Sequence, residues 1–198
     1  MKKFLFIFIF LFSYDSSAEQ KLTLVASINN SVITNLDISN EVELIAILNN
    51  SISVNNEAVK KAALDNLVEE ILKSSAIKKN SIDDIANNLI DKQYNSLLKK
   101  ISQNNKSISP EIKKNIYEKI LLDYQWNTLV SKKYSWMISV NMSEIDDKLK
   151  TAGEEINDQN KYQIKKNELI MIERNKKLSV YSQNYLEQIK KKALIKFF

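Results

Sequence analysis

LTLVASINNSVITNLDISNEVELIAILN, residues 22–49, is the stretch that decides the fold. Its first part alternates apolar residues with others, which is the two-residue period of a β-strand. The alternating apolar positions are Leu22, Leu24, Ala26 and Ile28. Asn29 and Asn30 follow, and asparagine tolerates the positive φ that a tight hairpin turn requires. With Ser31–Thr34 as the returning strand, the sequence predicts a β-hairpin at residues 22–34.

A helix is expected directly after this hairpin. Thr34 has the side chain of a helix N-cap, and Asp37 follows three residues later, near the positive end of the helix dipole. Four apolar residues then share one helical face: Ile38, Val42, Ile45 and Leu48.

An isolated two-stranded hairpin is only marginally stable in water, so this one needs a further strand or a covering helix. The late segment able to supply a strand is Ala193–Phe198, with the sequence ALIKFF. We therefore expect both ends of the folded chain to meet in one sheet. The predicted fold class is mainly α: a helical core with a small antiparallel sheet formed by the N-terminal hairpin and the C-terminal strand.

The remaining chain predicts more helices from apolar stripes at helical spacing and from capping residues. Their expected starts are Asn55 or Asn56, Ser81 with Asp84, Ser109 with Pro110, and Ser143, and Gly153 is expected to end the helix that Ser143 starts. The expected ranges are 57–77, 81–101, 109–133, 143–153 and 173–192. Met137–Val140 is expected to be extended, and Tyr162–Ile172 fits a strand about as well as the start of a helix.

Composition excludes several kinds of chemistry. The chain has 198 residues, with one glycine, one proline, no cysteine and no histidine. It therefore has no histidine base, no thiol nucleophile, no ordinary zinc site and no glycine-rich phosphate loop. An enzyme that uses Asp or Glu remains an alternative, although these residues fall mostly at helix starts and on polar faces. We expect neither enzyme activity nor a cofactor.

The first 18 residues have the pattern of a secretory signal peptide. Lys2 and Lys3 precede nine apolar residues, Phe4–Phe12, and Ala18 ends a small-residue cleavage site. Nine apolar residues are too few to span a bilayer, which requires about 20. Cleavage after Ala18 is the expectation, and an uncleaved membrane anchor is the alternative.

Four segments in order resemble the SurA family of periplasmic chaperones: VASINNSVITNLDISNEVELI at 25–45, ALDNLVEEILKSSAIKKNSI at 63–82, YSWMISVNMSEIDDKLK at 134–150 and YLEQIKKKALIKFF at 185–198. They resemble the family's opening hairpin and helix, its next helix, its extended exit segment, and its returning helix and terminal strand. In that family, parvulin-type peptidyl-prolyl isomerase domains usually sit before the returning helix, where this chain has only a short connector.

The resemblance implies a division of the chain and a function. It implies a signal peptide at 1–18, a hairpin and helical chaperone domain at 19–153, a connector at 154–172, and a C-terminal helix and strand at 173–198. The implied function is an ATP-independent periplasmic chaperone for unfolded outer-membrane proteins, without isomerase activity. The outer-membrane assembly machinery is a further partner that the resemblance implies. An envelope structural or membrane-tethered protein, or an accessory to a separate isomerase, is the alternative.

Such a chaperone needs apolar and aromatic surface, because tyrosine and tryptophan combine apolar area with a polar tip. The residues expected to line a substrate groove are Tyr94, Leu98, Tyr117, Leu121, Tyr124, Trp136 and Tyr185. For any one of them an ordinary core role is the simpler alternative.

The isoelectric point of about 9.1 raises nucleic-acid binding as another class of function. The lysines are spread along the whole chain, however, whereas a phosphate-binding surface would gather them on one face. We expect no nucleic-acid partner and no metal site.

Overall fold

The structure is a computed structural model that describes residues 21–49, 56–82, 87–103, 108–151 and 159–198. Expectations that fall on the other residues, including the signal peptide, Asn55, Asp84 and Gly153, lie outside the described chain. The elements in order are β1 (Leu24–Ile28), β2 (Ser31–Thr34), α1 (Asn35–Leu48), α2 (Glu57–Lys79), α3 (Asn87–Gln103), α4 (Pro110–Lys133), α5 (Met142–Thr151), α6 (Gln159–Lys192) and β3 (Ile195–Phe197).

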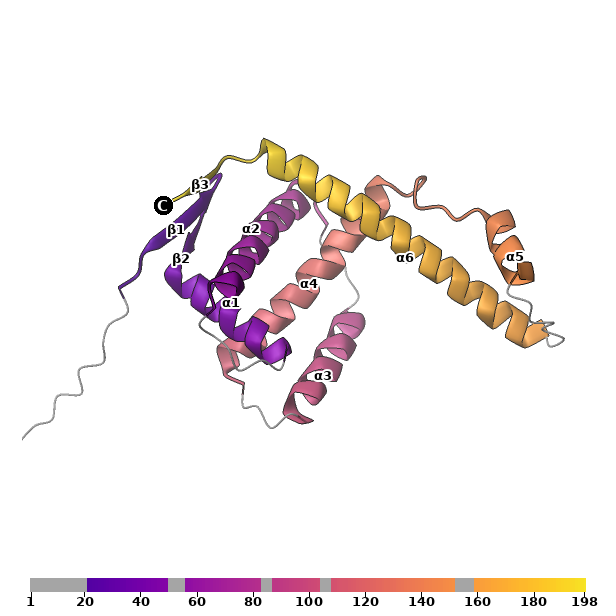
Figure 1. The fold of residues 1–198 in the computed structure, drawn as a ribbon, viewed down its shortest axis with the longest axis horizontal. Coiled ribbons are helices and arrows are strands. Elements are labelled where there is room, and N and C mark those ends of the chain that lie inside the picture. Colours follow the sequence, from indigo (N-terminus) through magenta and orange to yellow (C-terminus); the bar gives the residue numbers. More distant parts are fainter. Residues whose placement is uncertain (1–20, 50–55, 83–86, 104–107, 152–158) are drawn as a thin grey trace, which may run out of the picture.

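The three strands form one antiparallel sheet in the order β2-β1-β3, which confirms the expected fold class. Asn29 turns the hairpin with φ 52°. The central strand, β1, pairs on its other side with the C-terminal strand, and Ala26 lies opposite Phe197. Figure 1 shows this sheet at one end of the molecule, with the helices on one of its faces.

A β-bulge in β1 changes which side chains face the core. Leu24 pairs with Thr34 and Ala26 with Ile33, so Val25 is an extra residue between two neighbouring positions of β2. A bulge shifts the in–out alternation of the strand. Ala26 and Ile33 are therefore buried, while Leu24 is exposed. The simple alternation in the sequence wrongly places Leu24 in the core.

Three of the predicted helix starts are confirmed by their capping side chains. Thr34 and Asp37 form a reciprocal capping box at α1. The Asn56 side chain accepts from the backbone N–H of Ala58 at α2, and Ser109 caps α4 ahead of Pro110. Ser143 does not cap α5. Its own N–H donates to the side chain of Asn141, and the helix already begins at Met142.

Three other expectations need correction. Ser81 has φ 51°, so it lies in a left-handed turn after α2 and not in the extended conformation of an N-cap. Met137 and Ile138 donate backbone hydrogen bonds to the carbonyl oxygen of Tyr134, which makes a turn and not an extended segment. Tyr162–Ile172 is helical, which is one of the two alternatives that its sequence left open. It belongs to α6, so the final helix begins at Gln159, fourteen residues before its expected start at residue 173, and runs unbroken to Lys192.

The buried side chains form two apolar clusters. The larger joins the sheet to α2, the C-terminal part of α4 and the C-terminal half of α6, with Ile28 and Val130 fully buried. The smaller joins α1, α3 and the N-terminal part of α4 around Ile90 and Ile116. In α1 the buried face differs from the predicted one, since Leu44 and Ile47 are buried while Leu48 is exposed.

Candidate functional site

The N-terminal half of α6 projects beyond the helical core (Figure 1). The residues of α6 that pack in the larger apolar cluster all lie in its C-terminal half: Leu178, Tyr181, Tyr185, Leu186 and Ile189. The preceding part, residues 159–175, runs alongside α5 at the opposite end of the molecule from the sheet. We call this part of α6, together with α5, the arm.

One apolar face of α6 continues from the core onto the arm. Ile164, Met171, Leu178 and Tyr185 follow one another at intervals of seven residues, which is close to two helical turns. Leu178 and Tyr185 pack in the core, whereas Ile164 and Met171 are 60% and 63% exposed. Ile172 is 62% exposed, although it precedes buried Leu186 by fourteen residues, about four turns. We call Ile164, Met171 and Ile172 the arm face.

Helix α5 packs along a different side of residues 159–175 from the arm face, through a few apolar side chains and two ion pairs. Ile145 and Leu149 are buried. Lys166 Nζ lies 2.6 Å from Asp146 Oδ1, and Lys148 Nζ lies 3.1 Å from Glu173 Oε2. The hydrogen bond from Lys166 lowers the pKa of Asp146, and the hydrogen bond from Lys148 lowers that of Glu173. Helix α5 therefore covers the side of α6 that carries Lys166 and Glu173, and it leaves the arm face exposed.

Five of the seven predicted groove residues lie on α3 and α4 and pack against the smaller apolar cluster. Tyr94 and Tyr117 meet edge to face, with ring centroids 5.4 Å apart. All five are partly buried against the smaller apolar cluster: Tyr94, Leu98, Tyr117, Leu121 and Tyr124. Their side chains therefore serve mainly as packing, with part of each left at the surface.

The other two predicted residues lie apart from that group. Tyr185 stacks on Trp126, with ring centroids 5.3 Å apart, inside the larger cluster. Trp136 is 82% exposed in the turn after α4. Three residues further along, the carbonyl oxygen of Ser139 accepts a hydrogen bond from Lys177, which places this turn beside the base of the arm. The seven residues thus do not form one groove.

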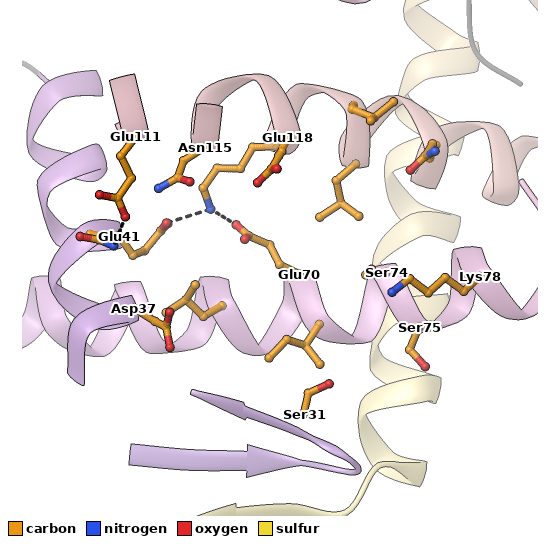
Figure 2. Close-up of a pocket in the computed structure, with 17 residues that line it drawn as sticks. Ser31, Asp37, Glu41, Glu70, Ser74, Ser75, Lys78, Glu111, Asn115 and Glu118 are labelled. Atoms are coloured by element: carbon orange, nitrogen blue, oxygen red, sulfur yellow. Dashed lines mark hydrogen bonds and ion pairs between the residues drawn. The ribbon is translucent and has the colours of Figure 1, made fainter. Parts of the chain in front are cut away.

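A polar cleft of about 700 Å³ opens between β2, α1, α2 and α4 (Figure 2). Its charged lining residues are Asp37, Glu41, Glu70, Lys78, Glu111, Glu118 and Lys119. Glu41 is only 5% exposed, and each of its two carboxylate oxygens has a polar partner. Glu41 Oε2 lies 2.8 Å from Lys119 Nζ, and Oε1 accepts from Asn66 at 3.0 Å. Glu70 also pairs with Lys119.

Burial and charge set the protonation of this trio. Burial raises the pKa of Glu70, because Lys119 is shared with Glu41 and offsets only part of the desolvation. Burial acts to lower the pKa of Lys119, but the two carboxylates outweigh it and raise that pKa. Through these two ion pairs the trio joins α1, α2 and α4.

Sequence reasoning missed both the trio and the arm face. Glu41 stands three residues after Ile38 and four before Ile45, so it shares a helical face with these apolar residues. A carboxylate on such a face is the sequence signal that could have predicted a buried charge. For the arm, Ile164 and Met171 continue the series of Leu178 and Tyr185, but the sequence does not show where the core beneath this face ends. No cluster of acidic residues suited to a metal ion occurs in the part of the chain that the structure describes.

Within the described ranges, no helix combines the length and the apolar character needed to cross a bilayer. A scan against models of protein families matches none of them, and a comparison with curated proteins finds no relative of this chain. The resemblance to SurA-type chaperones therefore remains an expectation from the sequence, and function has to be argued from the surfaces described above.

Proposed function

We propose that this protein is an ATP-independent chaperone that binds unfolded polypeptides on the arm. The observation that carries the proposal is the arm face, where Ile164, Met171 and Ile172 are exposed on the same side of α6 that packs in the core further along. Exposed apolar residues that continue a core-packing face are typical of a surface that binds another chain.

The size of this surface suits weak and reversible binding. Fully burying one large apolar side chain is worth roughly 1.5–3 kcal/mol, and these three are already partly covered. Trp136 and Met137, both exposed beside the base of the arm, add apolar area to the same region. Contacts of this strength hold an unfolded segment without a nucleotide-driven release step.

The compartment and the clients of the proposal come from the sequence. The pattern of residues 1–18 and the resemblance to SurA-type chaperones support a periplasmic location, and they make unfolded outer-membrane polypeptides the proposed clients. The outer-membrane assembly machinery is a further possible partner of the same proposal. Neither isomerase activity nor nucleic-acid binding forms part of it.

The test is suppression of aggregation of a β-barrel client diluted from urea, followed by light scattering without ATP. The natural chain should slow aggregation at several-fold excess. Ile164→Ser/Met171→Ser should remove most of that effect. Phe197→Ser/Phe198→Ser is the matched control, because Phe197 and Phe198 are 61% and 65% exposed, about as much as the two arm residues, and β3 lies at the other end of the molecule.

Two results would contradict the proposal. The natural chain could leave aggregation unchanged at every ratio tested. Alternatively, the arm variant could protect the client as well as the natural chain does while keeping the same thermal unfolding transition. Loss of protection in the control variant alone would place client binding at the sheet and not on the arm.

A further inference from the structure

A second exposed apolar surface lies at the end of the sheet farthest from the hairpin turn. The first residues of β1 and the last residues of β3 meet there because the two strands are antiparallel. The backbone N–H of Phe198 donates to the carbonyl oxygen of Val25 at 3.0 Å. Four large apolar side chains at this end are 52–65% exposed, and we call them the sheet-end patch: Leu22, Leu24, Phe197 and Phe198.

The charges beside this patch are basic. Lys196 Nζ lies 5.0 Å from the ring centroid of Phe198, and exposed Lys21 precedes Leu22 in the chain. Residues 188–198, QIKKKALIKFF, contain four lysines and no acidic residue. Lysines interleaved with aromatic and aliphatic residues are typical of surfaces that lie on anionic lipid, where apolar side chains enter the interface and lysines attract the headgroups.

The chain connection brings the patch close to a membrane. Residues 13–20 separate the apolar run Phe4–Phe12 from Lys21, which adjoins the patch. Eight residues span at most about 28 Å when fully extended. While Phe4–Phe12 is engaged by the export machinery or held in a bilayer, the patch therefore stays within that distance of the lipid surface.

We propose that the sheet-end patch binds the surface of an anionic membrane peripherally. A second copy of the chain fits the patch less well, because two copies would bring the lysines of both patches together and like charges repel. Lipid carries the opposite charge and needs no shape complementarity. The patch is separate from the arm face, so this proposal does not rest on the chaperone function.

The experiment is flotation of the full chain, as an exporting host produces it, with vesicles of two compositions. One is phosphatidylcholine alone, and the other contains about one-third phosphatidylglycerol. The natural chain should float with the anionic vesicles and be released by salt. Phe197→Ser/Phe198→Ser should weaken that binding about tenfold. Lys196→Glu should weaken it by about fivefold or more, since it reverses one charge near the surface.

Ile164→Ser/Met171→Ser is the matched control and should float like the natural chain. Leu22→Ser/Leu24→Ser leaves β3 intact and provides a second test of the patch if the first variant unfolds. The proposal is overturned if the natural chain does not float with anionic vesicles. It is also overturned if both patch variants float as well as the natural chain. Equal flotation with neutral vesicles overturns it too, because the segment at 1–20 would then be the anchor. A dimer that dissociates in the patch variants without any lipid binding overturns it as well.

Discussion

Lys119 joins three helices through two carboxylates, one on α1 and one on α2. Replacing it by methionine should leave Glu41, which is almost completely buried, without a cationic partner. Removing one partner of such a pair costs about 3–5 kcal/mol of unfolding free energy. Urea unfolding of Lys119→Met should show that loss, and Glu41→Gln/Lys119→Met should recover part of it.

Lys114 on the same helix is the matched control. It pairs with Glu118 at 3.7 Å, and both side chains are largely exposed. Lys114→Met should change the unfolding free energy by no more than about 0.5 kcal/mol. Equal effects of the two substitutions would mean that the trio is not a buried network.

Glu70 should make stability depend on pH in a specific direction. Burial raises its pKa above the ordinary value of 4.5, so the folded state holds the proton more tightly than the unfolded state does. Its contribution to stability is therefore greatest below pH 4.5 and falls as the pH rises through the raised pKa. Urea unfolding from pH 4 to pH 7 should show the stability of the natural chain falling relative to Glu70→Gln. A natural chain that gains stability relative to Glu70→Gln as the pH rises would contradict this assignment.

Single residues were predictable where the signal is local. Thr34 with Asp37, Asn56, and Ser109 with Pro110 depend only on neighbours within one turn, and each caps its helix as expected. Ser143 failed because Asn141, two residues earlier, offers an equally good acceptor. Exposure of Leu24 depends on a bulge relative to β2, and no pattern within β1 encodes it.

At the scale of elements, β3 completes the sheet that covers the larger apolar cluster. Removing residues 193–198 uncovers the pairing edge of β1 beside Ala26 and Ile28, both fully buried. We expect a loss of about 2–5 kcal/mol in unfolding free energy, measured by urea denaturation. Phe197→Ser/Phe198→Ser keeps the backbone pairing and should lose less than about 1 kcal/mol. A truncated chain as stable as the natural one would mean that the strand adds nothing to the core.

The two halves of α6 should differ in local stability. Residues 178–189 supply side chains to the core, whereas residues 159–175 pack against α5. Segments with few buried contacts open without global unfolding. Hydrogen exchange followed by mass spectrometry should show faster exchange in the arm. Leu149→Ala, in α5, should accelerate exchange in the arm with little change in global unfolding, and uniform protection along α6 would contradict this expectation.

The existence of each described helix was predictable, but the course of α6 was not. Ile164, Leu169, Ile170 and Ile172 fit two periods because the helix changes partners along its length, packing first on α5 and then on the core. In α1 both sides of the helix are covered, so Leu44 and Ile47 are buried outside the single predicted stripe. The period of apolar residues in a sequence predicts a single buried face. A helix that is covered by neighbours on two sides does not show such a period.

For the whole molecule, the meeting of the two chain ends was predictable because the hairpin needed a third strand and one late segment could supply it. The predicted groove was not obtained: Tyr94 and Tyr117 lie in the smaller cluster, Tyr185 in the larger, and Trp136 at the surface. Most of the aromatic residues predicted to line the groove instead fill the junctions between helices.

The arm and the sheet-end patch lie at opposite ends of the molecule (Figure 1). The two proposed activities should therefore operate together. Protein bound to anionic vesicles should still slow client aggregation, and Ile164→Ser/Met171→Ser should abolish that protection without releasing the protein from lipid. Competition between client and vesicles, seen as release of the protein on addition of client, would mean that both use the same surface.

The closure of the sheet by β3 also has a consequence for the order of events during synthesis and during the proposed export. Leu194 donates its backbone N–H to the side chain of Asn29 across 165 residues of sequence. A chain that crosses a pore with its first residues leading would present the hairpin long before its third strand arrives. Throughout that interval an open backbone edge stays available to other chains, and such an edge invites mispairing. The time that the chain takes to pass through the pore would therefore set how long the edge of β1 stays unpaired and open to association with other chains.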